Sequence, residues 1–229
     1  MFRSVALLFA LGLALQANAS VESELLAIKS VEVKLISTDV GSSYLAPRST
    51  TNGCDQFQPA QLDPALSAGL DDIISVGSKI WKIIEDNKPV VTVDIPTVNA
   101  LPRNGTCWLD YDHWQAPRAL TYEVVYKNLF GISVVTFRFR LQYTYGGGMN
   151  GRGQYLANVT VKPATIDVLW LYAFNAKVEV GNTVNMGTKD DPIAGLELNL
   201  NWQVKTAVSE EDRSMQFFVQ GDGQTLERQ

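Results

Sequence analysis

The sequence predicts a mainly β domain: a curved antiparallel β-meander or β-sandwich of about 7–8 strands with one packed amphipathic helix at residues 66–86. Long segments in the second half of the chain alternate apolar and polar residues, as half-buried strands do. Short connections rich in turn-forming residues separate them, which favours antiparallel neighbours over βαβ crossovers. One earlier segment instead repeats its apolar residues with helical spacing.

The first strand is expected at residues 29–37. In an extended chain Val31, Val33 and Leu35 fall on one face of this segment. Residues 38–62 are rich in Ser, Thr, Gly, Pro and Asn, which is typical of a loop. So long a loop is uncommon in a compact domain, and we expect a covalent link to hold it.

The helix is predicted because the apolar residues of 66–86 recur with the spacing of one helical face. Those residues are Leu70, Ile73, Ile74, Gly77, Ile80, Trp81 and Ile84. Asp71 and Asp72 lie in the N-terminal half, where negative charge suits the helix dipole, and Pro89 closes the element. We therefore expect this helix to pack against an apolar face of the sheet.

The remaining chain is predicted to be almost entirely β. Its alternating segments are residues 89–95, 120–126, 135–145, 155–161, 166–180, 196–204 and 215–219. Residues 146–153 connect two of them, and residues 166–180 are apolar on both faces, which predicts a central strand. Several of these segments are long enough that the sheet must twist, curve or bulge.

The composition suits one folded domain that does not bind nucleic acid. The chain has 229 residues, of which 46% are hydrophobic and 19% charged, so it can bury a full core. Its formal net charge is −5, whereas nucleic-acid binding requires a basic face. A single histidine excludes His-rich metal sites, and no pattern in the sequence indicates a metal ion or a cofactor.

Residues 1–19 are predicted to be a secretory signal peptide. Arg3 supplies the positive start, an apolar run follows, and Ala17-Asn18-Ala19 has the small-x-small pattern that signal peptidases cleave. No later stretch is long and apolar enough for a membrane helix, so we expect no integral membrane segment after cleavage. Residues 20–229 would then form a single mainly β domain, exported to a periplasm or secreted.

Cys54 and Cys107 are the only cysteines of the chain. In an oxidising compartment this pair predicts one disulfide bond. In the chain-entropy model, closing a loop of this size stabilises the fold by roughly 4 kcal/mol. The two residues are far apart in sequence and form no Cys-x-x-Cys motif, so we expect a structural rather than a redox role.

The densest group of chemically versatile side chains lies at residues 108–114. We take Trp108, Asp110, Asp112, His113 and Trp114 as candidate ligand-binding residues. Carboxylates beside indole rings suit a sugar, a cation or a cationic group. The alternative is that the aromatic rings cap the core while the Asp side chains satisfy turns.

Gly146-x-Gly148-x-x-Gly151 matches the letters of the dinucleotide-binding pattern. That chemistry requires the glycines to lead into a helix, whereas the residues that follow alternate like a strand. We therefore interpret the motif as a glycine-rich hairpin. Arg152 beside it is a further candidate contact for a partner.

The functional hypothesis is an exported binding or interaction module for a protein or glycan ligand. The polar side chains of Arg138, Arg140, Asn199, Asn201 and Gln203 would provide a wet sheet face for it. No Gly-x-Ser-x-Gly elbow or other catalytic spacing occurs, so we expect no catalytic residues. Two alternatives stay open: a membrane-interacting or pore-forming β protein, and a hydrolase acting on extracellular carbohydrates or esters.

Overall fold

The computed structural model describes residues 21, 23–41, 73–92, 95–103, 105 and 110–229. The strands of the first sheet are β1 (Ile28–Val40), β2 (Ile73–Gly77), β5 (Val98–Pro102), β6 (Tyr111–Asp112), β7 (Arg118–Asn128), β8 (Ser133–Met149) and β9 (Arg152–Val168). Those of the second are β3 (Ile80–Glu85), β4 (Lys88–Pro89), β10 (Ala173–Asn185), β11 (Ala194–Lys205), β12 (Glu210–Gln220) and β13 (Thr225–Arg228).

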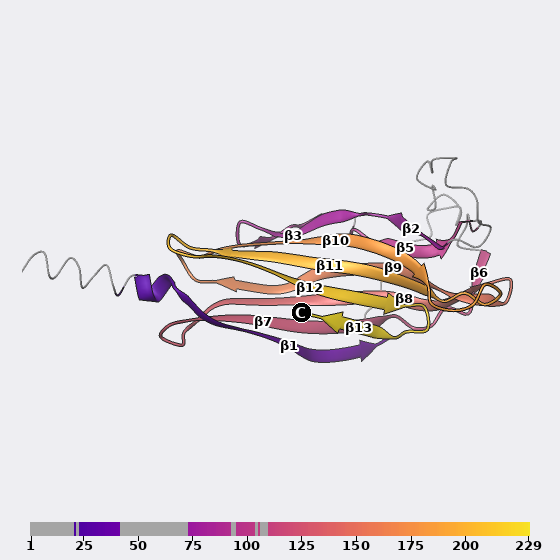
Figure 1. The fold of residues 1–229 in the computed structure, drawn as a ribbon, viewed down its shortest axis with the longest axis horizontal. Helices are drawn as coiled ribbons and strands as arrows, with labels where there is room; N and C mark the ends of the chain where they lie inside the picture. The colour runs from indigo at the N-terminus through magenta and orange to yellow at the C-terminus, as the bar shows by residue number, and fades with distance from the viewer. Residues whose placement is uncertain (1–20, 22, 42–72, 93–94, 104, 106–109) are drawn as a thin grey trace, which may run out of the picture.

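Both sheets are antiparallel and run along the length of an elongated molecule (Figure 1). The 7-stranded sheet has the order β1-β7-β8-β9-β5-β2, with β6 paired to β8, and the 6-stranded sheet has the order β13-β12-β11-β10-β3-β4. The predicted mainly β class is confirmed. The strands are more numerous than predicted, because residues 73–112 form several short strands that the alternation did not reveal.

The two sheets bury one shared apolar core, as expected of a β-sandwich. Aromatic rings from opposite sheets meet in this core. The ring centroids of Tyr122 of β7 and Phe217 of β12 are 5.3 Å apart, and those of Phe137 of β8 and Phe174 of β10 are 5.0 Å apart. Such tilted pairs add to the stabilisation from buried area. The predicted alternation places these rings inward, on the face of each sheet that is turned to the core.

The helix predicted at 66–86 is wrong where the structure describes it. Residues 66–72 lie outside the described part, and residues 73–85 form β2 in one sheet and β3 in the other. Gly77 separates the two strands with a φ of 120°, and a Cβ there would overlap the carbonyl oxygen of Thr97. That conformation breaks a helix, and the β-branched isoleucines of the segment favour strands.

Asp86, the last residue of the predicted helix, and the following Asn87 form a turn. Their φ angles of 47° and 64° are those of a two-residue hairpin turn joining β3 to β4. The strand predicted at 89–95 shrinks to Lys88–Pro89 among the described residues. The segment forms a hairpin and not a helix, because in the hairpin Trp81 and Ile83 are both buried in the core.

Residues 166–180 are not one central strand. β9 continues through Pro163, where a register shift in its pairing with β8 accommodates the proline, and ends at Val168. A turn with Leu171 at φ 72° follows before β10 begins. Likewise the connection expected at residues 146–153 contracts to Asn150 and Gly151, because the neighbouring glycines belong to the strands.

The predicted leader at residues 1–19 and both Cys54 and Cys107 lie outside the described residues. The signal peptide and the disulfide bond therefore stay predictions. Within the described residues, no helix has the length and apolar character needed to span a membrane.

Candidate functional site

Two of the predicted site residues and the glycine-rich hairpin meet at one end of the sandwich. Asp112, at the end of β6, pairs with Gly148 of β8, which brings the 110–114 segment against the β8–β9 hairpin. Together they line a recess of about 580 Å³, here called the end pocket. Its described lining includes Asp112, His113, Tyr145, Gly151, Gln154 and Asp222. The sequence pattern predicted both halves of this pocket but not their contact.

The polar half of the end pocket is exposed to solvent. His113 Nδ1 lies 2.8 Å from Asp112 Oδ1, and the two side chains are 79% and 57% exposed. His113 has a φ of 61°, which turns the chain sharply after β6. The described residues that line the pocket include no serine, threonine or cysteine beside this pair. The geometry offers a hydrogen-bonding contact at the mouth of the end pocket.

The aromatic half of the cluster closes the core. The ring of Trp114 lies over Gly147, where a Cβ would overlap the indole, and 5.9 Å from the ring of Tyr111. Tyr111 in turn contacts Tyr155 edge to face at 6.0 Å. Burial raises the pKa of Tyr111 well above its usual range. Such contacts are those expected of aromatic rings that cap the core, which is one of the two alternatives for this cluster.

The remaining predicted residues do not join the end pocket. Asp110 is half-buried in the short turn before β6 and Arg152 is exposed at the start of β9, and neither lines the pocket. Trp108 lies outside the described residues. Among the described residues, Asp112 and His113 are therefore the predicted site residues that line the end pocket, together with backbone of the glycine-rich hairpin, and the ligand-binding role of the set stays a prediction.

A larger recess lies on the outer face of the 6-stranded sheet. This polar groove, of about 780 Å³, is lined by Lys82, Asn175, Lys177, Asn201, Gln203 and Ser214, with Asp212 at its edge. Their alternation with core residues turns these side chains outward. The register then aligns them across strands: Lys177 pairs with Lys82 and Asn201, and Asn201 with Ser214.

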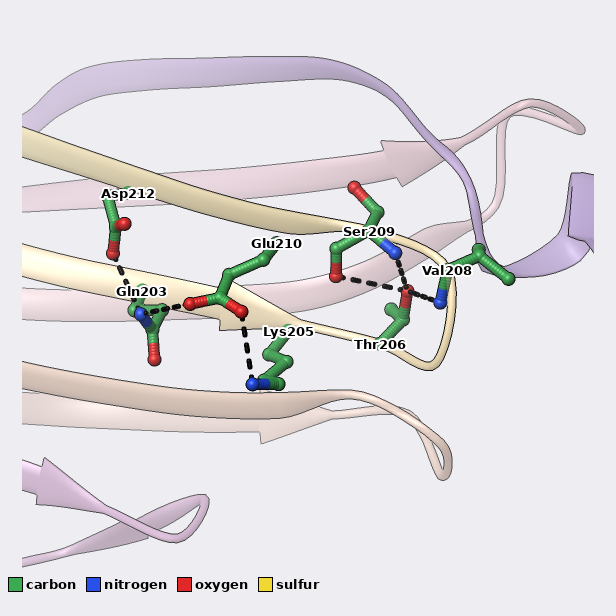
Figure 2. A network of polar contacts seen from close by, with 7 residues as sticks. All are labelled: Gln203, Lys205, Thr206, Val208, Ser209, Glu210 and Asp212. Atoms are coloured by element: carbon green, nitrogen blue, oxygen red, sulfur yellow. Dashed lines mark hydrogen bonds and ion pairs between the residues drawn. The ribbon is translucent and has the colours of Figure 1, made fainter.

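One rim of the polar groove is fixed by a network of side-chain contacts (Figure 2). The Gln203 amide nitrogen donates to Glu210 Oε1 and to Asp212 Oδ1, both at 3.0 Å. Lys205 Nζ lies 3.0 Å from Glu210 Oε2. Because both donors of Gln203 are engaged, its carbonyl oxygen is the group left to accept a hydrogen bond from a ligand.

The groove has hydrogen-bonding capacity without a dominant charge. Lys177 Nζ lies 2.6 Å from Glu179 Oε1, and the side chain of Lys82 forms an ion pair with Glu85. In the described part of the chain, Asn201 makes no side-chain hydrogen bond, so its amide is available in full. Paired surface charges beside open amide groups suit a neutral polar ligand better than an ion.

Arg138 and Arg140 do not belong to this surface. They lie on the outer face of the 7-stranded sheet, where Arg138 Nε is 2.6 Å from Glu123 Oε2 and Arg140 Nε donates to Thr121 Oγ1 at 3.2 Å. The five polar residues grouped in the sequence therefore divide between two opposite faces. Asn199, Asn201 and Gln203 share β11 and one face, as their spacing predicted.

Among the described residues, no group of three or more His, Cys, Asp or Glu side chains is arranged to hold a metal ion. Comparisons of the chain with protein-family models, with curated proteins and with solved structures find no significant match. The functional inference therefore rests on the fold and on the chemistry of the two recesses.

Proposed function

We propose that this chain is an exported binding module that holds a neutral, hydroxyl-rich ligand, such as a glycan, in the polar groove. The observation that carries the proposal is the row of outward amide and hydroxyl groups at Asn175, Asn201, Gln203 and Ser214 beside a fixed rim. A recess with a few convergent polar groups is the usual form of a small-ligand site.

The chemistry of the groove favours hydroxyl groups as the recognised feature. A sugar hydroxyl both donates and accepts a hydrogen bond, and a side-chain amide offers both complements. Asn175 Oδ1 already accepts from the backbone N–H of Asp86 at 2.9 Å, which orients its NH₂ donors. Strand residues in paired register hold these groups at fixed spacing, which lowers the entropy lost on binding.

Binding is supported over catalysis by the state of the sole histidine. His113 and Asp112 form an exposed pair at the other recess, away from the groove residues. A catalytic base is ordinarily placed within reach of a nucleophile or a held substrate. If the purified protein nonetheless hydrolysed a carbohydrate or ester panel and His113→Ala abolished the turnover, the binding proposal would be overturned.

The direct test is a screen of neutral and acidic oligosaccharides immobilised on an array, followed by titration calorimetry of the hits. We expect neutral oligosaccharides to bind, and Asn201→Ala and Gln203→Ala each to weaken binding roughly 5- to 10-fold, as loss of one hydrogen bond does. Gln142→Ala is the matched control, because Gln142 lies on β8 of the other sheet. Absence of binding to any oligosaccharide, or equal loss in the control, contradicts the proposal.

A further inference from the structure

Large apolar side chains are exposed on two turns at one end of the molecule. They are Leu129, Phe130 and Ile132 in the β7–β8 turn, and Leu169, Trp170 and Leu171 in the β9–β10 turn. Trp170 is 74% exposed and Phe130 is 54% exposed. Tight turns ordinarily carry Gly, Asn, Asp, Pro or Ser, so this composition is not explained by turn formation.

These two turns form one surface, which we name the apolar end. The backbone N–H of Leu169 donates to the carbonyl oxygen of Val134 at 2.9 Å, which holds the β9–β10 turn against the start of β8, next to the β7–β8 turn. Asn128 Nδ2 and Tyr172 Oη both donate to the carbonyl oxygen of Leu25, at 3.1 and 2.7 Å, and so tie the first described residues to the same place. The β11–β12 connection, with exposed Val208, lies at this end too (Figure 1).

The backbone conformation of Leu171 also indicates that this turn interacts with another surface. Its φ of 72° lies in the left-handed region, which an L side chain with a bulky Cβ substituent adopts at an energetic cost. The side chain is 48% exposed, so burial in the core does not offset that cost. Backbone strain that is kept at an exposed apolar turn indicates a functional contact at that turn.

We propose that the apolar end inserts into a lipid surface. The apolar residues lie on separate connections at one end of the molecule, the β7–β8 hairpin and the β9–β10 crossover between the two sheets, and not on one continuous sheet face. A stable protein partner would need a complementary surface of about 800 Å² on each side, whereas a fluid lipid layer moulds itself around separate tips. Tryptophan and phenylalanine are also the residues that favour the boundary between lipid headgroups and acyl chains.

The charged residues near the apolar end indicate whether electrostatic attraction or apolar burial drives insertion into the lipid. Lys29, Lys88, Lys127 and Lys205 lie near this end, but so do Asp86, Asp167 and Glu210, and Glu210 is paired with Lys205 at 3.0 Å. Among the described residues, acidic and basic side chains are thus mixed at this end, and they form no basic surface that would select anionic lipids. Insertion therefore depends on burial of apolar area, and binding to phosphatidylcholine vesicles should change little with salt.

The test is sedimentation of the purified protein with sucrose-loaded vesicles of pure phosphatidylcholine, free of any glycan so that the polar groove plays no part. We expect the wild-type protein to sediment with the vesicles and to show a blue-shifted tryptophan emission. Trp170→Ser and Phe130→Ser should each lower the partition coefficient roughly tenfold, and the double variant roughly a hundredfold.

Ile80→Ser and Leu226→Ser are matched controls, because both side chains are large, apolar and exposed but lie away from the apolar end. They should partition like the wild type. Unchanged thermal unfolding of all variants shows that the fold is kept, since every replaced side chain is exposed. Failure of the wild type to sediment, or equal losses in the controls, overturns the proposal. So does a concentration-dependent dimer that Trp170→Ser abolishes, because the apolar end would then bind a second copy.

Discussion

A buried hydrogen bond between two side chains links the two sheets through the core. Trp202 of β11, 3% exposed, donates from Nε1 to the hydroxyl of Tyr126 on β7 at 2.8 Å, and Tyr126 is fully buried. Tyr126→Phe keeps the aromatic ring and removes only the acceptor. The indole N–H is then left buried without that partner, which costs about 1–3 kcal/mol.

The expected loss is measurable by urea unfolding followed by tryptophan fluorescence. In a parallel thermal unfolding experiment, a change of about 2 kcal/mol lowers the midpoint temperature of a domain of this size by roughly 4–8 °C. In urea it lowers the midpoint concentration and leaves the m-value unchanged. Combining Tyr126→Phe with Trp202→Phe gives a double-mutant cycle. The double variant should lose less stability than the two single losses added together, since the orphaned N–H is gone.

Tyr145→Phe is the matched control for this prediction. Tyr145 is partly buried, and its hydroxyl makes no side-chain hydrogen bond within the described residues. Its replacement should change the free energy of unfolding by less than about 0.5 kcal/mol. Equal effects of Tyr126→Phe and Tyr145→Phe, or a coupling energy of zero in the cycle, would refute the assigned role of the inter-sheet bond.

Three further outcomes are expected. Burial raises the pKa values of Tyr122 and Tyr143 above the usual value near 10. The stabilisation from their neutral hydroxyls is thus complete below about pH 10 and is lost as the pH rises through the raised values. Tyrosinate absorbance should therefore appear together with alkaline unfolding, and its gradual appearance in folded protein would contradict this. Gly147→Ala should cost about 1–3 kcal/mol and change the near-UV circular dichroism, because the new Cβ displaces Trp114; an unaltered spectrum would argue against that contact. Gly151→Ala should cost about 1 kcal/mol from its φ of 71° alone, since no atom lies within 4 Å of the added Cβ, and an unchanged urea midpoint would show that the turn relaxes.

Much of the second half of the fold was predictable because the core residues of β8 and β11 alternate regularly. Val135, Phe137 and Phe139 face inward from β8, and the side chains between them face outward, as a period of two requires. The failed helix shows the limit of this reasoning. Trp81 and Ile84 satisfy helical spacing and are also buried in β3, so spacing alone does not distinguish the two structures. The isoleucines and Gly77 were the local signals against a helix.

The sites were only partly predictable for a different reason. Residues 110–114 and the glycine-rich hairpin are each recognisable, but their contact depends on β6 pairing with β8, which is a long-range register. The polar groove depends on four strands aligned side by side, and only β11 showed its share as a regular Asn and Gln alternation. Lys82 was concealed within the segment interpreted as a helix. Sequence spacing reports neighbours along one strand and not those across the sheet.

The length of the β8–β9 hairpin also sets the distance between the end pocket and the apolar end. Each of its strands has 17 residues, which at roughly 3.3 Å per residue amounts to about 55 Å. The Asn150–Gly151 tip lies at the end pocket, and the opposite ends of the same strands lead into the Phe130 and Trp170 turns. A membrane seated on the apolar end would therefore hold the end pocket several bilayer-headgroup thicknesses above the lipid. At that height Asp112 and His113 face molecules in the surrounding medium rather than headgroups, and the rigid hairpin acts as a spacer between the two.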